Sequence, residues 1–281
     1  MRIISDTTCH LMVDEAKREQ IILVANQIVY KDKTFRDYLD IDSASFMKLL
    51  EHDFATTSQP AIGEVMKAYE ATRPEETLHI TTGKGLSSAY DSASGVKNSI
   101  QADHVTVFSS RSVAGPNRYI TLLASKLSKL NMSKVEIIER LQRCVNDTQS
   151  YVIPVNFKFL QNSGRLTAPA AILGGFLKLK PVMAQSTDKL KIDKFAITRT
   201  WPSAIKSVVD DLVKRGVDFK HKIYVLHAFN KASAAMAINA IKERISNADI
   251  ESFVLAPAMI THGGPECLVI QYILKDNIYD K

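Results

Sequence analysis

Apolar residues follow two alternating patterns along the first half of the chain. Short runs of β-branched and apolar residues, typical of buried strands, alternate with segments whose apolar residues recur every three or four positions, as on one face of a helix. We predict strands over residues 2–5, 20–30, 77–82 and 104–108, and helices over residues 43–54, 62–72, 87–100, 117–130 and 133–146. Strands that alternate with helices in this way indicate a parallel sheet covered by helices.

The second half of the chain has a different pattern. Residues 176–182 and 189–197 alternate apolar and polar side chains on either side of a polar segment, residues 186–188, which is typical of an antiparallel hairpin. We also predict strands over residues 150–155, 222–227, 252–256 and 268–274, and helices over residues 201–215 and 232–246. The change of pattern between the two halves predicts two closely packed α/β domains: residues 1–150 around a parallel sheet, and residues 151–281 around a mixed sheet.

Two helices carry sequence signals at their ends. Ser133 and Glu136 have the S-x-x-E spacing of a capping box at the start of the helix over residues 133–146. Trp201-Pro202 opens the helix over residues 201–215, and Gly216 follows it, as expected for proline at the first turn and glycine just past the end. These signals define the ends of both helices more clearly than the periodicity of their apolar residues does.

The composition is that of a folded protein with a mild positive charge. The 281 residues are 46% hydrophobic and 23% charged, and the formal net charge is +6. No run of five or more Lys/Arg occurs, so nucleic acid binding is not expected. The positive charge suits an anionic ligand, an acidic partner or, at most, transient contact with an anionic membrane. No apolar stretch reaches the roughly 18–20 residues of a membrane helix, and we expect a soluble, cytoplasmic protein.

The cysteines and histidines do not form a metal site by their spacing. Cys9, Cys144 and Cys267 are far apart, and no two of the seven histidines have HExxH spacing. Gly83-Lys84-Gly85 completes neither G-x-G-x-x-G nor G-x-x-x-x-G-K-[ST], so it does not indicate a nucleotide loop. We predict neither a metal nor another cofactor.

Two clusters of hydroxyl residues precede predicted helices. TTSQP includes Thr57 and Ser58, and GKGLSSAY includes Ser87. Hydroxyls at a helix N-terminus often only cap the helix. Together with free backbone N–H groups they also bind carboxylate or phosphate. Because open α/β folds bind ligands at the carboxyl ends of their strands, the two clusters indicate a shared anion site there.

Three further residues are candidates for a polar site. Arg165 follows the glycine of NSGRL, and Arg199 ends the second strand of the predicted hairpin. Either arginine alone is also consistent with an ordinary solvated surface residue. His262 lies in THGGP, which reads as a glycine-rich turn that could bring backbone close to a ligand or could be only a turn.

Several segments together resemble the DegV family of fatty-acid-binding proteins, in the same order along the whole chain. The matching segments are ISDTTCHL (residues 4–11), TSQP (57–60), GLSSAY (85–90), FLQNSGRL (159–166), LKLKPVM (177–183) and THGGP (261–265). TSQP is the family's most specific tetrapeptide and is intact here. Arg199 falls where the family carries an arginine.

The resemblance implies a fold, a ligand and a partner. The implied fold is the two-domain DegV fold, with a long-chain fatty acid buried between and inside the domains. Thr57, Ser58 and Ser87 would then hydrogen-bond the carboxylate. Arg199 and His262 would lie near the head group, and Arg165 is a weaker candidate for fixing the carboxylate network.

The implied role is a carrier rather than an enzyme. The protein would hold the acid for phosphorylation by an ATP-dependent fatty acid kinase subunit, and would itself carry no catalytic residue.

The chain departs from the family pattern at several positions around the expected site. His10 stands where an acid is usual, Lys84 lies where a serine pair is usual, and Ser109 replaces an aspartate. Ile260 and Glu266 replace glycines that flank the histidine motif. These departures concern the outer rim, where a kinase would act, more than the carboxylate pocket.

Two other functions remain open at this stage. The first is a serine-dependent hydrolase or acyl transferase that uses Ser58 or Ser87 with His262, although the sequence lacks G-x-S-x-G. Such a serine needs the histidine within hydrogen-bond reach and an acid that orients it. The second is an interaction module that has lost its ligand.

Overall fold

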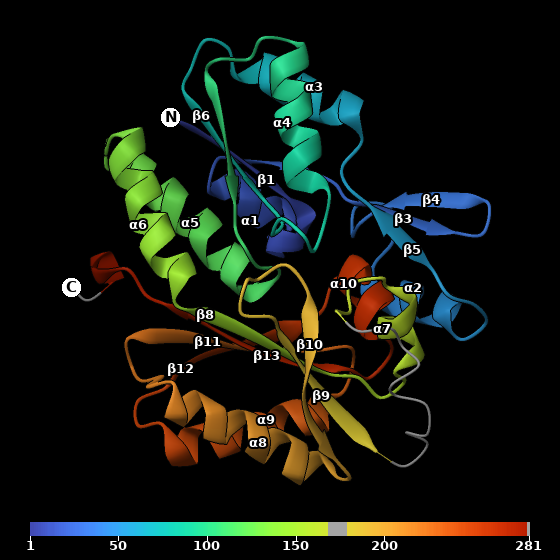
Figure 1. Cartoon of the computed structure of the whole chain (residues 1–281). Helices are drawn as coiled ribbons and strands as arrows, with labels where there is room; N and C mark the ends of the chain where they lie inside the picture. The colour runs from blue at the N-terminus through green and yellow to red at the C-terminus, as the bar shows by residue number, and fades with distance from the viewer. Residues whose placement is uncertain (168–178, 280–281) are drawn as a thin grey trace.

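The computed structural model describes residues 1–167 and 179–279, and these residues form three β-sheets with helices packed around them (Figure 1). The first sheet is parallel, with strand order β2-β1-β6-β7. Its strands are β1 (Arg2–Asp6), β2 (Ile21–Val24), β6 (Thr77–Thr81) and β7 (Val105–Ser109).

The second sheet is mixed and contains six strands in the order β10-β9-β8-β13-β11-β12. Its β11 and β12 are parallel, and all its other pairs are antiparallel. Its strands are β8 (Thr148–Ile153), β9 (Lys180–Gln185), β10 (Ile192–Thr198), β11 (His221–His227), β12 (Asp249–Val254) and β13 (Leu268–Leu274). The predicted fold class, a parallel-sheet part followed by a mixed-sheet part, is confirmed.

A small antiparallel sheet stands at the side of the molecule (Figure 1). Its strands are β3 (Gln27–Tyr30), β4 (Lys33–Arg36) and β5 (Thr56–Ser58), in the order β4-β3-β5. The prediction of one strand over residues 20–30 is therefore wrong. The chain leaves the parallel sheet at Ala25 and Asn26, where the Asn26 backbone N–H donates to Thr7 Oγ1 over 3.0 Å, and then starts the small sheet.

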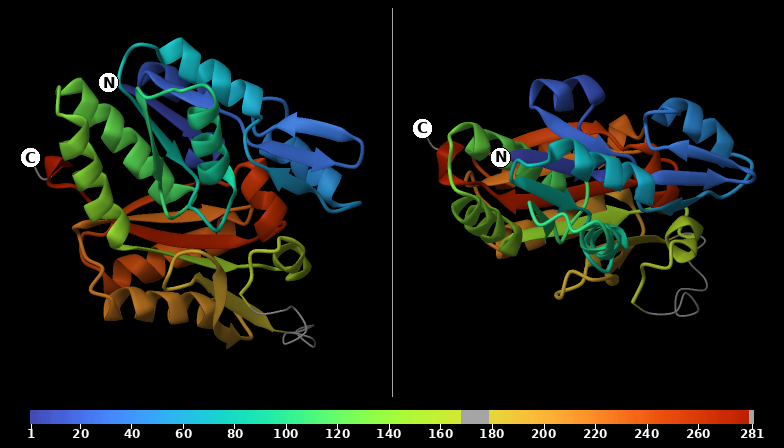
Figure 2. Two further views of the ribbon diagram at one scale, coloured as in Figure 1. Left: turned by 45° about the horizontal axis from the view of Figure 1, so that its top comes forward. Right: turned by 90° about the horizontal axis from the view of Figure 1, so that it is seen from above.

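Helices cover the outer faces and fill the space between the two large sheets (Figure 2). α3 and α4 pack on one face of the parallel sheet, whereas α5 packs on β1 and β6 and also reaches β11 and β13 of the mixed sheet. α8 and α9 cover the outer face of the mixed sheet. The helices are α1 (Val13–Arg18), α2 (Ser43–Leu50), α3 (Ile62–Thr72), α4 (Ala89–Ser99), α5 (Gly115–Lys129), α6 (Lys134–Asn146), α7 (Lys158–Asn162), α8 (Trp201–Lys214), α9 (Lys231–Arg244) and α10 (Pro257–Gly263).

The core between the sheets depends on a close approach at the start of α5. A Cβ atom added at Gly115 would lie 2.3 Å from Cγ of Tyr224 on β11, so only glycine fits there without a shift. Leu123 and Leu127 follow on the same helix, are fully buried and belong to the largest apolar cluster. This packing holds the two large sheets together.

Local signals correspond closely to observed helix ends. The capping box of Ser133 and Glu136 forms at α6, and Pro202 lies in the first turn of α8. The predicted hairpin is observed as antiparallel β9 and β10; its residues 176–178 lie outside the described residues. No helix in residues 1–167 and 179–279 combines the length and the apolar character needed to cross a membrane.

Candidate functional site

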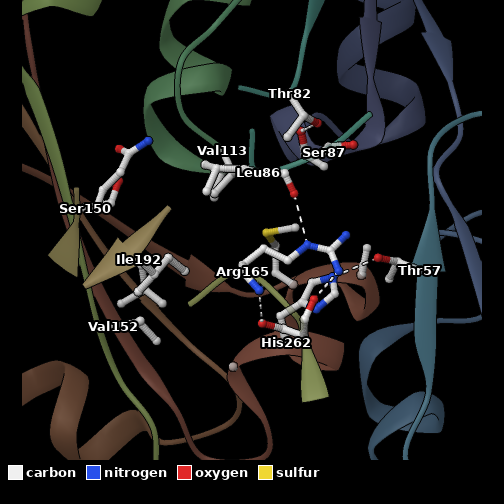
Figure 3. Close-up of a pocket in the computed structure, with 18 of the residues that line it drawn as sticks. Thr57, Thr82, Leu86, Ser87, Val113, Ser150, Val152, Arg165, Ile192 and His262 are labelled. Atoms are coloured by element: carbon white, nitrogen blue, oxygen red, sulfur yellow. Dashed lines mark hydrogen bonds between the residues drawn. The ribbon is translucent and has the colours of Figure 1, made fainter. Parts of the chain in front are cut away.

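A cavity of about 210 Å³ lies between the parallel and the mixed sheet, at the carboxyl ends of β1 and β6 (Figure 3). This edge of a parallel sheet is where open α/β folds usually bind ligands. Its apolar wall residues are Leu86, Val113, Ala114, Tyr151, Val152, Leu160, Ala184, Ile192, Leu255, Ala258, Met259 and Val269. The interior of the cavity is thus mostly apolar, and its polar side chains lie in separate groups rather than scattered over the wall.

Thr57 and His262 meet at one side of the cavity (Figure 3). Thr57 Oγ1 lies 2.8 Å from His262 Nε2. Thr57 lies on β5 and not at a helix entrance, because α3 begins only after Ala61, which provides no side-chain cap. His262 was predicted in a turn, but Pro257 starts α10, and the histidine lies in its last turn before Gly264 ends it at φ 79°.

His262 is neutral in the folded protein. Burial, and to a lesser extent the charge of Arg165, lower the pKa of the His262 imidazole to about 3. Its second ring nitrogen, Nδ1, is buried and has no hydrogen-bond partner among the described residues. A neutral imidazole bonded to Thr57 can orient the threonine hydroxyl, and it adds no positive charge.

The second hydroxyl cluster lies opposite the first across the mouth of the cavity. The Ser88 hydroxyl donates to Gln59 Oε1 over 2.7 Å, which joins the two clusters. Ser87 lines the cavity, and its Oγ accepts the backbone N–H of Ala89 over 3.1 Å at the start of α4. Ser58 also lines the cavity, but its side chain is exposed and makes one long contact, 3.5 Å to the Gln59 carbonyl oxygen.

Arg165 reaches into the cavity between these groups (Figure 3). Its Nε donates to the Leu86 carbonyl oxygen over 3.1 Å, and its Nη1 donates to the carbonyl oxygen of Ser163. Gly164, at φ 69°, forms the turn that points the arginine inward. Burial lowers the pKa of the guanidinium, and within the described ranges no carboxylate forms an ion pair with it. Arg165 is thus a half-buried cation without a counter-ion among the residues that the structure describes.

A buried carboxylate stands behind two threonines of the cavity wall. Asp6 Oδ2 accepts the backbone N–H of Thr82 over 2.6 Å and its hydroxyl over 2.8 Å. Asp6 Oδ1 accepts from the hydroxyl of Thr8, which in turn lies 2.8 Å from Thr82 Oγ1. Burial raises the pKa of Asp6, although these hydrogen bonds act against the rise. The network fixes the orientation of both threonines toward the cavity.

The structure brings five of the six candidate residues to this one cavity and leaves the sixth outside. Arg199, predicted near the head group, is exposed and is not part of the cavity wall. Ile192, at the start of β10, lines the cavity, and seven residues of strand at about 3.3 Å each place Arg199 roughly 20 Å farther along. Arg199 thus lies outside the cavity wall, and its place near a bound head group stays a prediction.

The geometry offers little to a serine nucleophile. His262 Nε2 is bonded to Thr57 rather than to Ser58 or Ser87. In the part of the chain that the structure describes, no acid orients Nδ1 of His262, as a triad requires. The same part contains no group of three or more His, Cys, Asp or Glu that could hold a metal ion.

Several polar residues of the wall, Gln59, Ser88, Thr82 and Asn26 among them, were not chosen as candidates from the sequence. Gln59 and Ser88 lie inside the quoted hydroxyl segments and could have been chosen on that ground. Thr82 is the last residue of a predicted strand, which is the signal for the carboxyl edge of the sheet. Asn26, whose buried Oδ1 has no partner among the described residues, gave no signal because it lay inside a predicted strand.

Comparisons with known proteins agree along nearly the whole chain. The DegV protein of Bacillus subtilis is 25% identical over 281 residues, which cover 97% of this chain and 99% of that protein. Its crystal structure, described as that of a fatty acid binding protein, has a TM-score of 0.83 and covers 98% of this chain and 99% of that chain.

Two further solved structures share the fold at lower identity. A fatty acid binding DegV family protein from Streptococcus agalactiae has a TM-score of 0.88 at 19% identity, covering 98% of this chain and 99% of that chain. A stearic acid-binding protein from Eubacterium ventriosum has a TM-score of 0.85 at 18% identity, with the same coverage. The profile of a family described as "Uncharacterised protein, DegV family" matches residues 1–275. This chain therefore belongs to the DegV family.

Proposed function

We propose that this protein binds a long-chain fatty acid in the cavity and presents its carboxylate to an ATP-dependent kinase, which forms the acyl phosphate. The observation that carries the proposal is Arg165, a half-buried cation without a carboxylate partner in the described residues, beside Thr57 at the polar side of a largely apolar cavity. The descriptions of the Bacillus subtilis and Eubacterium ventriosum proteins as fatty acid and stearic acid binders support it.

Arg165 and the hydroxyls complement a carboxylate in different ways. A buried carboxylate needs paired charge or several hydrogen bonds, and Arg165 supplies the charge. If His262 Nε2–H donates to Thr57 Oγ1, the threonine keeps its own hydrogen for a ligand oxygen. Ser87 lies on the facing loop and can donate its hydroxyl hydrogen, because its bond to Ala89 uses the oxygen only as an acceptor.

The apolar walls supply most of the binding free energy. Transfer of one CH₂ group from water to an apolar site contributes about 0.8 kcal/mol, so a long acyl chain contributes far more than one hydrogen bond. The carboxylate contacts then fix which end of the acid lies at Thr57. Because the tail supplies the affinity and the carboxylate contacts supply the orientation, a kinase can change the head group while the tail stays bound.

The phosphoryl transfer itself is assigned to a partner. The sequence has no G-x-x-x-x-G-K-[ST] segment that would hold ATP phosphates. Ser58 and Ser88 are exposed at the mouth of the cavity, so a partner could reach a carboxylate held there. Because the proposed kinase uses ATP, we also propose that the phosphorylation takes place in the cytoplasm.

Lipid extraction tests the proposal directly. The full-length chain is purified without added lipid, denatured and extracted with organic solvent, and the extract is quantified by mass spectrometry. We expect close to one long-chain fatty acid per chain, or uptake to that ratio after incubation with oleic acid. A chain that neither carries nor takes up a fatty acid would contradict the proposed function.

A further inference from the structure

The wall of the cavity opposite Thr57 also contains polar side chains, and these come from the mixed sheet (Figure 3). Ser150 on β8 and Gln271 on β13 are paired in the antiparallel register and both line the cavity. Val152 and Val269 line the same cavity two residues away on each strand. Ser150, Gln271 and, on β9, Gln185 therefore interrupt a wall in which the neighbouring valines suit a hydrocarbon tail.

The Nε2 group of Gln271 has no hydrogen left to donate to a ligand. Its Nε2 donates to the Val113 carbonyl oxygen over 3.1 Å and to Ser150 Oγ over 2.8 Å. Its Oε1 accepts the backbone N–H of Gly115 over 3.0 Å. Gln271 is fully buried, so these contacts hold Ser150 Oγ in the position of an acceptor.

The hydroxyl hydrogen of Ser150 has at most one weak acceptor among the described residues. In residues 1–167 and 179–279, the one other polar atom bonded to Ser150 Oγ is Ser112 Oγ, at 3.4 Å. Hydroxyl–oxygen hydrogen bonds are normally about 2.5–3.0 Å long, so this contact is weak. The Ser150 side chain is only partly buried although it lies inside the molecule, because it faces the cavity.

We infer that Ser150 is a specificity-determining residue that donates a hydrogen bond to an oxygen atom carried part-way along the acyl chain. The chemical class of ligand is then an oxygenated fatty acid, with a hydroxyl or a keto group between its carboxylate and its methyl end. A plain alkyl chain would leave the Ser150 hydrogen against methylene groups, with the long contact to Ser112 Oγ as its one acceptor among the described residues. This inference rests on the proposed function, because it assumes that the tail extends from Thr57 toward β8.

The test compares plain with oxygenated acids of equal length. Affinities for stearic acid and for a series of hydroxy- and ketostearic acids, with the oxygen at successive mid-chain carbons, are measured by displacement of a fluorescent fatty acid. One hydrogen bond corresponds to an affinity change of about three- to tenfold. We expect a preference of this size for the oxygenated acid, with a maximum at one chain position, because Ser150 is fixed in the sheet.

Three variants locate the preference at Ser150. Ser150→Ala should abolish the preference and the positional maximum, whereas Ser150→Thr, which keeps a hydroxyl, should retain both. Val152→Ala is the matched control on the same strand and the same wall: it should weaken all the acids alike and leave their ratio unchanged.

The outcomes separate the two proposals. Equal or weaker binding of every oxygenated acid by the wild-type chain would overturn the inference and needs no variant to interpret. A preference that survives Ser150→Ala would also overturn it. If the wild-type chain bound neither plain nor oxygenated acids, the proposed function would fail as well.

Discussion

Replacing Arg165 tests how the head group is held. Arg165→Gln removes the positive charge, but the shorter side chain keeps an amide that can donate to the carbonyl oxygens of Leu86 or Ser163. The substitution therefore changes electrostatics more than loop structure. Arg165→Lys is the matched variant, because it keeps the charge and loses the planar fork that binds carboxylate with two hydrogen bonds.

The expected magnitude follows from the burial of the guanidinium. A hydrogen bond to a charged group contributes about 1.5–3 kcal/mol. Arg165 is only half-buried, and solvent weakens the interaction, so we take the lower part of that range, about 1.5–2 kcal/mol. Arg165→Gln should then bind a fatty acid roughly 10–30 times more weakly than the wild-type chain. Arg165→Lys should fall between the two.

The assay compares oleic acid with methyl oleate on both proteins. The two ligands share a tail, but only the acid carries a charge that Arg165 can pair. The wild-type chain should prefer the acid, and Arg165→Gln should lose most of that preference. The reasoning is refuted if Arg165→Gln binds the acid as tightly as the wild-type chain. It is also refuted if the acid and the ester lose equal affinity, since that would show damage to the loop.

Three further predictions concern the head-group hydroxyls, the core and a buried histidine. The double variant Thr57→Val, Ser87→Ala should carry less fatty acid after purification while its circular dichroism stays unchanged; undiminished lipid would contradict our assignment. Gly115→Ala should lower the free energy of unfolding in urea by about 1–3 kcal/mol through overpacking, whereas the control Gly95→Ala, in open space within α4, should raise it by up to about 1 kcal/mol. Burial lowers the pKa of His79 to about 3, so the unfolded chain binds more protons between about pH 6.5 and 3, and the free energy of unfolding falls as pH drops through this window. His79→Phe should make that fall shallower, and an unchanged slope would show that His79 is not responsible.

Elements defined by local signals were predictable from the sequence. The helix over residues 62–72 and the strand over residues 268–274 were predicted with the bounds of α3 and β13. The apolar residues of α3 recur on one buried side, whereas β13 is a short apolar run that is buried on both faces. The capping box at Ser133 was equally clear, since both partners lie within four residues.

Elements defined by distant contacts were not predictable. The apolar run over residues 20–30 reads as one strand, and its division depends on Asn26, which meets Thr7 from another part of the chain. Two glycines made the segment around His262 read as a turn. The proline at residue 257, which starts α10, is the local signal for a helix in this segment.

In the candidate site too, local features were predictable from the sequence, and contacts between distant segments were not. Residue types indicated an anion site made of hydroxyls, and the family resemblance indicated which residues to examine. Neither could show that Thr57 bonds His262 or that Arg165 bonds the Leu86 carbonyl, because each contact joins segments far apart in sequence. Arg199 was indicated by the resemblance alone, and because it follows β10 at the end away from Ile192, it lies outside the cavity wall.

A crystal structure of the chain with a long-chain fatty acid brominated at its methyl end would locate both ends of the ligand at once. We expect the carboxylate within about 3.2 Å of Thr57 Oγ1 and of the Arg165 guanidinium. We expect the anomalous signal of the bromine among the apolar walls between the two large sheets. A carboxylate bound away from Thr57 and Arg165, or a bromine signal at the mouth beside Ser58, would contradict this placement of the ligand.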